Sequence, residues 1–240
     1  MIPTPDALIA RLREHADADN VAGMARFGIS AQGTLGVSMP VMRDMAREVE
    51  RELKTQPETL HELAAGLWTS GVHEARILAA LVDVPALVTP EQADAWVADL
   101  DSWDVCDQLC GNLLDRTSFA WGKPEEWAGR DEEFVKRAGF VLMCGLAVHD
   151  KAASDAAFEP FLSLCEREAG DDRNFVRKAV NWAVRQIGKR DARLNGLAIA
   201  AAERIREQGS KSARWIAADA LRELTSPAVA ARFDRAGGRR

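Results

Sequence analysis

The sequence contains no tyrosine and only four cysteines among its 240 residues. Cys106, Cys110, Cys144 and Cys165 all lie inside apolar helical patterns. We therefore expect reduced thiols in the core of a cytoplasmic protein rather than a disulfide framework. No apolar run approaches the ~20 residues of a membrane-spanning helix. The first fifteen residues lack the basic and apolar regions of a secretory signal, so we expect neither a signal nor membrane association.

Signatures of several catalytic and ligand-binding classes are also missing. Neither a strand nor a P-loop lysine accompanies Gly33 and Gly36, which excludes a phosphate-binding loop of that kind. Cys106 and Cys110 are four residues apart, and no histidine or second cysteine pair stands at a zinc-ligand spacing. Redox pairs have two intervening residues, and this pair has three. We therefore expect no metal and no cofactor.

The two histidines with an acidic neighbour are His73, in VHEAR, and His149, in AVHDK. Each stands near an expected helix end. No serine or cysteine partner for nucleophilic catalysis is recognisable for either of them. We interpret both as structural histidines.

Acidic residues outnumber basic ones, and the net charge of −6 argues against a nucleic-acid binder. The distribution is uneven, however. Residues 171–222 hold 12 basic and 6 acidic side chains, so this segment carries +6 and the rest of the chain −12. A polyanion could use such a local surface, or the basic residues could simply coat solvent-exposed helix sides. Charge alone leaves both alternatives open.

Apolar residues recur with helical spacing nearly everywhere. The residues that punctuate this pattern are prolines where helices would begin (Pro40, Pro57, Pro90, Pro124) and glycines where helices would end (Gly170, Gly188, Gly209). The sequence predicts an all-α chain of antiparallel helix pairs, with helices of about 12–18 residues. We expect a glycine-rich loop over Phe27–Pro40 and an irregular connector, packed by aromatic residues, over Ser118–Arg130.

An internal echo indicates repeats. FVKRAGF (Phe134–Phe140) returns 41 positions later as FVRKAVN (Phe175–Asn181), and RWIAADALREL (Arg214–Leu224) follows RKAVNWAVRQI (Arg177–Ile187) by 37 positions. A period near 40 with two helices per unit is typical of HEAT-like repeats. Such pairs stack into a curved superhelical solenoid whose groove is lined by every second helix. A helical bundle without true repeats is the alternative. We predict a single domain over residues 1–240.

The segment SWDVCDQLC (Ser102–Cys110) gathers an indole, two carboxylates and two thiols. Ser102 is a suitable N-cap, which places Asp104 in the first turn, where a carboxylate favours the helix dipole and has a structural role. Trp103 and Asp107 are four residues apart and lie side by side on one helix face. Either they are a core indole and a surface carboxylate, or they belong to a site.

A second tryptophan stands among basic residues. Trp182 is flanked on the same helix side by Arg185 and Lys189, and Arg137 occupies the equivalent segment one repeat earlier. Together with the indole and carboxylate of Ser102–Cys110, these side chains would line a groove with π faces, a negative charge and a phosphate ligand. Such a groove would attract a cation and hold an anion.

Resemblance to a known family rests on five segments: SWDVCD, FVKRAGF, AVHDK, RNFVRKAVNWAVRQIGKR and SARWIAADALREL. In this order and spacing they resemble the HEAT-repeat DNA alkylation repair glycosylases of the AlkD type, from about Gly36 to Thr225. The resemblance implies hydrolysis of the N-glycosidic bond of cationic alkylpurines, such as 7-methylguanine and 3-methyladenine, in base-excision DNA repair. It also implies that Trp103, Asp107 and Trp182 are the catalytic residues.

The partner implied by the resemblance is double-stranded DNA carrying alkylated bases. The residues expected to contact this DNA are Arg137, Arg173, Arg177, Lys178, Arg185, Lys189, Lys211 and Arg214. We expect the protein to act as a monomer in the cytoplasm. The alternative is a non-catalytic HEAT-like module that binds DNA or a protein partner.

Overall fold

The computed structural model describes residues 3–237. Over this range the chain forms fourteen α-helices and two short 3-10 helices and contains no strand, which confirms the all-α prediction. Tertiary contacts divide the chain into two compact units, Met1–Phe119 and Ala120–Arg240. The single domain expected over residues 1–240 stays a prediction.

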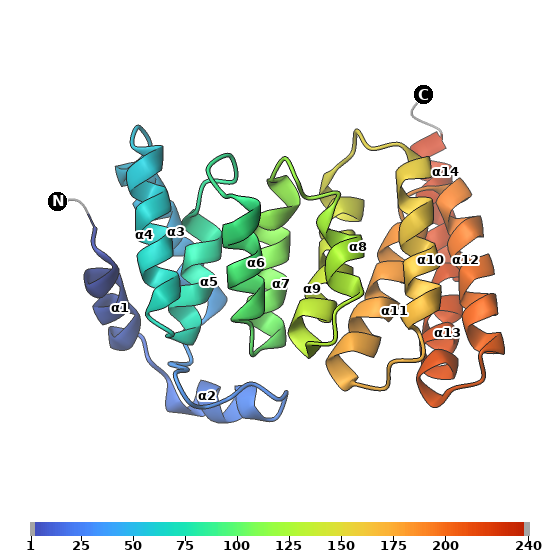
Figure 1. Ribbon diagram of the computed structural model, residues 1–240, viewed down its shortest axis with the longest axis horizontal. Coiled ribbons are helices and arrows are strands. Elements are labelled where there is room, and N and C mark those ends of the chain that lie inside the picture. The colour runs from blue at the N-terminus through green and yellow to red at the C-terminus, as the bar shows by residue number, and fades with distance from the viewer. Residues whose placement is uncertain (1–2, 238–240) are drawn as a thin grey trace. The chain divides into compact units, whose positions relative to one another are not determined.

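The first unit contains α1 (Pro5–Glu14), α2 (Ala18–Ala25), α3 (Met39–Glu52), α4 (Pro57–Thr69), α5 (His73–Val82), α6 (Pro90–Ala98), α7 (Trp103–Asn112) and the 3-10 helix η1 (Leu114–Arg116). Helix α5 is its centre, because it packs against α3, α4 and α7 and buries eight of its ten residues. Figure 1 shows α2 running across the direction of α3, α4 and α5. This helix has no buried residue of its own.

The second unit contains α8 (Lys123–Ala128), α9 (Glu133–His149), the 3-10 helix η2 (Asp155–Phe158), α10 (Glu159–Glu168), α11 (Asn174–Gly188), α12 (Ala192–Glu207), α13 (Lys211–Leu224) and α14 (Pro227–Gly237). Contacts join α8 to α9, α10 to α11 and α12 to α13 as pairs, and α11 also packs against both α9 and α13 (Figure 1). The echoing segments fall on α9, α11 and α13. The rings of Phe134 and Phe175, which are equivalent in the echo, lie 5.5 Å apart. The repeat is therefore a stack of equivalent helices.

The predicted punctuation is confirmed. Prolines are the first or second residues of α3, α4, α6 and α8, where the missing N–H costs no helical hydrogen bond. Gly188 is the last residue of α11, and Gly170 and Gly209 follow the ends of α10 and α12. Gly209 has a φ of +74°, a left-handed conformation that favours glycine.

The connector expected over Ser118–Arg130, a less regular stretch of the sequence, contains the short helix α8, whose start Pro124 marks. The helix has only six residues and lies pressed against α9. Gly139 of α9 allows this approach, since a Cβ there would lie 2.7 Å from the backbone N of Ala128. The aromatic packing was predicted correctly: Trp127 of α8 is 2% exposed. Helices such as α2 and α8 are also shorter than expected.

All four cysteines are free and buried, as predicted. Burial raises the pKa of Cys110 and of Cys165 well above the ordinary thiol value, which keeps these thiols protonated and unreactive. Among the helices of residues 3–237, none has the length and apolar character needed to cross a membrane.

Candidate active site

Helix α7 places Trp103 in its first turn and Asp107 one turn later, and both side chains are half-buried. Ser102 is the N-cap residue, as predicted, but its hydroxyl donates to the carboxylate of Asp104 rather than accepting from a helix N–H. Asp104 itself accepts from the N–H of Val105 at 3.0 Å. The first turn thus carries a carboxylate that offsets the positive end of the helix dipole.

A pocket of about 560 Å³ lies beside α7 within the first unit, a volume typical of small-ligand sites. Trp103 and Asp107 both line it, so the structure brings these two predicted residues into one site. Most of the remaining lining is apolar and comes from α2, α3, α5 and the loop before α3: Met24, Phe27, Val37, Met39, Met42 and Ile77. Water-poor walls of this kind strengthen electrostatic interactions inside the pocket.

The predicted loop Phe27–Pro40 forms part of the pocket wall, and a buried carboxylate fixes it there. Glu74 of α5 is fully buried. Its carboxylate accepts the backbone N–H groups of Leu35 at 2.9 Å, Gly36 at 2.7 Å and Val37 at 3.3 Å. A carboxylate that accepts several N–H bonds is stable without a basic partner. Glu74 therefore shapes the wall of the pocket.

The indole of Trp103 is held by the same loop. Its Nε1–H donates to the carbonyl oxygen of Phe27 at 3.1 Å, across 76 residues of chain. The side chain of Phe27 is 69% exposed, although it is large and apolar. The indole is thus fixed in orientation, and an exposed phenyl ring lies at the edge of the pocket.

His73 and Asp104 form an ion pair in the pocket lining, with 2.8 Å between Nε2 and Oδ2. Burial by itself would lower the pKa of His73, but the hydrogen bond and charge of Asp104 outweigh it, so that this pKa is raised. Burial would likewise raise the pKa of Asp104, and the interaction with His73 lowers it instead. His73 is a satisfied histidine, as predicted, but its partner is Asp104 and not the adjacent Glu74.

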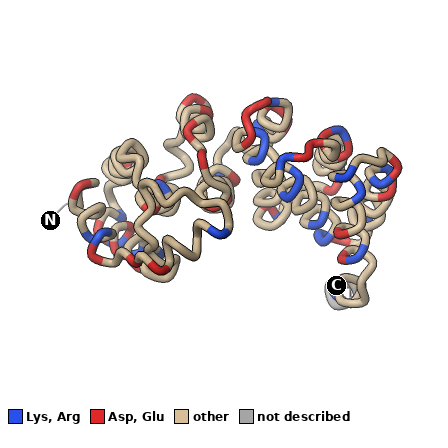
Figure 2. The backbone as a smooth tube through the Cα atoms, turned by 90° about the horizontal axis from the view of Figure 1, so that it is seen from below, with Lys and Arg blue, Asp and Glu red and all other residues tan. Residues whose placement is uncertain are grey.

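In the second unit, Trp182 lies half-buried on α11, and the two basic residues that follow it on this face are engaged in ion pairs. Arg185 pairs with Asp219 at 3.3 Å and with Glu223, and Lys189 pairs with Glu223 at 2.7 Å. Figure 2 shows the same mixture, with blue positions of this unit alternating with red ones. These carboxylates offset part of the positive charge that either residue could offer to a phosphate.

Two of the arginines expected to contact DNA are anchored inside the unit. Arg137 is 5% exposed, and its Nη1 donates to the carbonyl oxygen of Phe175 at 2.7 Å, which ties α9 to α11. Arg173 forms an ion pair with Asp171 at 2.6 Å and also donates to the carbonyl oxygen of Asp131 at 2.5 Å. Both guanidinium groups hold neighbouring helices and loops together in this structure.

The other four candidates are more accessible. Lys178, Lys211 and Arg214 are exposed. The guanidinium of Arg177 lies 5.2 Å from the ring centroid of Trp215, which is itself 39% exposed. These residues present positive charge to solvent on α11 and α13. Trp103 and Asp107 belong to the first unit and Trp182 and Arg137 to the second, and that all four line one cleft stays a prediction.

Sequence reasoning missed the apolar part of the pocket around Trp103. Met24 precedes the glycine-rich loop, and Phe27 and Met39 stand at its two ends, at the N-terminal edge of the family resemblance. A sequence signal existed, because three glycines, Gly28, Gly33 and Gly36, lie within this one loop. In the structure all three have a positive φ. Such spacing indicates a loop with a defined shape, and a shaped loop is often part of a site.

The comparisons with known proteins agree with this architecture. A family model described as "DNA alkylation repair enzyme" matches residues 8–224. A solved structure matches the fold with a TM-score of 0.72 and 16% sequence identity, over 84% of this chain and 83% of that chain. That structure represents "a new family of proteins related to the HEAT-like repeat DNA glycosylases with affinity for branched DNA structures". The predicted HEAT-like fold is confirmed. No curated protein matches the chain in sequence.

Proposed function

Because the chain belongs to the DNA alkylation repair enzyme family, we propose that it is a DNA glycosylase for cationic alkylpurines in duplex DNA. The substrates are bases such as 7-methylguanine and 3-methyladenine. The observation that carries the proposal is the shared pocket of Trp103 and Asp107 on α7. An indole and a carboxylate one helical turn apart, at the edge of an apolar pocket, are suited to a positively charged reaction centre.

The reaction needs no acid, because the leaving base already carries a positive charge. As the bond between C1′ and the purine nitrogen breaks, its electron pair neutralises the base, and positive charge develops on the deoxyribose. The carboxylate of Asp107 stabilises this oxocarbenium-like centre and orients a water molecule. The water oxygen bonds to C1′, and its proton passes to the carboxylate and then to solvent.

Asp107 is assigned this role because it lines the pocket one helical turn after Trp103 on the same helix. Asp104 is paired with His73, and Glu74 accepts three backbone N–H groups. Trp103 contributes through its π face, since a desolvated indole–cation contact is worth about 1–2 kcal/mol. The apolar walls exclude water and so increase the effect of each charge.

The second unit supplies the remaining contacts in this proposal. Trp182 provides the second indole beside the sugar. The exposed Lys178, Lys211 and Arg214 contact phosphates of the DNA backbone, which makes binding strongly salt-dependent. Arg137 is buried and keeps its bond to the Phe175 carbonyl, so in this proposal it supports the DNA-contacting residues by holding α9 against α11.

The proposal is tested with two duplexes that differ in one base. One carries 7-methylguanine, and the other carries hypoxanthine, a neutral purine, at the same position. Wild-type protein is incubated with each, and the released base is quantified. The proposal predicts release of 7-methylguanine and no release of hypoxanthine, since a neutral base departs poorly without protonation and the imidazole of His73 in the pocket lining is engaged with Asp104. Equal release of both bases contradicts it.

A second candidate function is binding of DNA without excision. It is favoured by the shared fold with proteins described as having affinity for branched DNA structures. Under this candidate the wild-type protein releases no base at any pH or salt concentration but still binds duplex or branched DNA. The same incubation, followed by a binding measurement on the unreacted duplexes, separates the two functions.

A further inference from the structure

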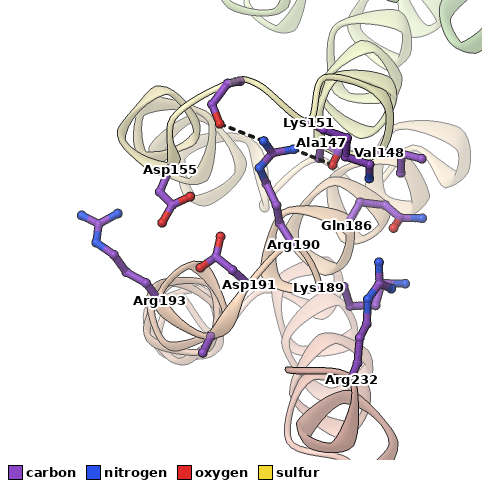
Figure 3. A pocket seen from close by; sticks show the side chains of 12 residues that line it. Ala147, Val148, Lys151, Asp155, Gln186, Lys189, Arg190, Asp191, Arg193 and Arg232 are labelled. Atoms are coloured by element: carbon purple, nitrogen blue, oxygen red, sulfur yellow. Dashed lines mark hydrogen bonds between the residues drawn. The ribbon is translucent and has the colours of Figure 1, made fainter. Parts of the chain in front are cut away.

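A second cavity, of about 490 Å³, lies wholly within the second unit, where the ends of α9 and α11 meet the start of α12 (Figure 3). Its charged lining residues are five cations (Lys151, Lys189, Arg190, Arg193, Arg232) and two carboxylates (Asp155, Asp191). The lining is therefore cationic in a protein whose net charge is −6. A cavity of this size holds a ligand larger than a single ion.

Arg190 forms the frame of the cavity. Its Nη1 donates to the carbonyl oxygen of Ala147 at 3.0 Å and its Nη2 to that of Ala153 at 2.8 Å. The guanidinium also lies 4.5 Å from the ring centroid of Phe158. Arg190 thus fastens the turn after α9 to the turn between α11 and α12, and the cavity has a fixed wall.

The cationic side chains gather on one side of this frame. In Figure 3, Lys151, Gln186, Lys189 and Arg232 lie on the same side of Arg190. Lys151 and Arg232 are exposed, and neither makes an ion pair with another residue of the described chain. Lys189 gives one N–H to Glu223 at 2.7 Å and keeps two further donors. This side therefore presents three positive groups and an amide to a ligand.

The two carboxylates lie on the other side, together with Arg193 (Figure 3). Asp191 caps α12 by accepting the N–H of Leu194 at 2.8 Å, and Arg193 pairs with Glu159 at 2.5 Å. Some loss of hydration and the neighbouring carboxylate of Asp191 raise the pKa of Asp155. The acidic groups are thus engaged with each other and with a helix N-terminus, away from the Lys151 side.

We propose that Lys151, Lys189 and Arg232 form a phosphate-binding site that holds the backbone of a DNA strand, separate from the pocket of Trp103 and Asp107. The choice of DNA over a free anion rests on the proposed function and on the register of α11. Gln186 and Lys189 follow Trp182 by four and seven residues and share its helix face. A rise of 1.5 Å per residue puts Lys189 about 10 Å from Trp182 along the helix, or about three nucleotides at 3.4 Å each. A strand that passes Trp182 reaches this cavity.

The test measures binding of an undamaged duplex as a function of salt, so that it does not depend on excision. Lys151→Gln and Arg232→Gln are expected to weaken binding roughly fivefold to tenfold each at about 0.1 M salt. Each should also reduce the slope of log K against log salt by about 0.9. Asp155→Asn removes a carboxylate from the same cavity and should have the opposite effect, which is tighter binding of the duplex.

The matched control is Arg206→Gln. Arg206 is exposed on α12 like Arg193, but 13 residues away, or about 20 Å along the helix. Arg206→Gln should leave the affinity within twofold of wild type and the salt slope unchanged. If Lys151→Gln and Arg232→Gln behave like this control while wild type binds the duplex, the phosphate site is refuted and the glycosylase proposal is untouched. If wild type excises nothing but the slope of log K against log salt falls in these two variants, the phosphate site stands without the glycosylase.

A further arm distinguishes DNA from a free anion. Inorganic phosphate is titrated into the protein by calorimetry at constant ionic strength. The proposal predicts no saturable binding in the low millimolar range. Saturable phosphate binding that disappears in Lys151→Gln, with an unchanged DNA slope, overturns the assignment to a DNA strand. Failure of wild type to bind any duplex at low salt overturns it as well.

Discussion

Replacement of Glu74 by alanine removes the carboxylate that holds the pocket loop. Three backbone donors then lose their acceptor: the N–H groups of Leu35, Gly36 and Val37. A buried donor without a partner costs about 1–3 kcal/mol. The bond to Val37 is long at 3.3 Å, and Leu35 is only part-buried, so Gly36 carries the largest share. We expect Glu74→Ala to lower the free energy of unfolding by about 3–5 kcal/mol.

The assay is urea unfolding followed by tryptophan fluorescence, with hydrogen exchange of the three amides as a local readout. Glu74→Gln keeps one carbonyl oxygen with two lone pairs, so its loss should be smaller, about 1–2 kcal/mol. Glu62→Ala, an exposed change on α4, is the control and should stay within about 0.5 kcal/mol of wild type. If the two units unfold in separate steps, only one step should shift.

The reasoning is refuted if Glu74→Ala unfolds within about 0.5 kcal/mol of wild type and its three amides keep their protection. That result would mean that the loop is held by its apolar contacts and that the carboxylate is dispensable. A destabilised variant with unchanged base release would separate stability from function, because the wall of the pocket would then be unnecessary for excision.

Three further predictions concern pH, the indole and salt. The Asp104–His73 pair stabilises the fold at pH values above the ordinary pKa of Asp and below that of His, and this stability is lost as pH rises through the raised pKa of His73. Asp104→Asn should therefore cost about 1.5–3 kcal/mol of unfolding free energy near pH 5.5 and less near pH 8.5. Trp103→Ala should slow base release about 5–30-fold, from the loss of about 1–2 kcal/mol, and Trp103→Phe less. Glu223→Gln releases two basic partners and should tighten duplex binding and steepen its salt slope by about 0.9 per new phosphate contact.

Each of these has a contradicting result. A stability loss in Asp104→Asn that is the same at both pH values would show that His73 stays neutral. Equal rates for Trp103→Ala and wild type would show that the indole is only a structural part of the pocket wall. Unchanged duplex affinity in Glu223→Gln would show that its basic partners do not face DNA.

The helices were predictable because their signals are local. Proline at a first turn, glycine after a last turn and the echo between Phe134 and Phe175 each depend on a few neighbouring residues. Pro124 marked the start of helix α8, but the extent of this helix was not predicted, because six residues are too few for a helical period to appear. Its place is set by the close approach that Gly139 allows, which is a tertiary property.

The candidate site was predictable only in part, since its partners are distant in sequence. Trp103 and Asp107 share a helix, and their proximity follows from the helical period. The bond from Trp103 to Phe27 spans 76 residues, and the pair of His73 with Asp104 spans 31. Neither partner has a local signature. The ion pairs of Arg185 with Asp219 and Glu223 of α13 were hidden for the same reason. The sequence therefore overstates the positive charge available to DNA.

The central claim is that the carboxylate of Asp107 assists departure of a cationic base. Its most direct test is single-turnover release of 7-methylguanine by wild type and by Asp107→Asn, with Asp101→Asn, an exposed neighbour, as the control. The account predicts a rate about 100–1,000-fold lower for Asp107→Asn, with duplex affinity within twofold of wild type and a control that matches wild type. Equal rates for wild type and Asp107→Asn would contradict it.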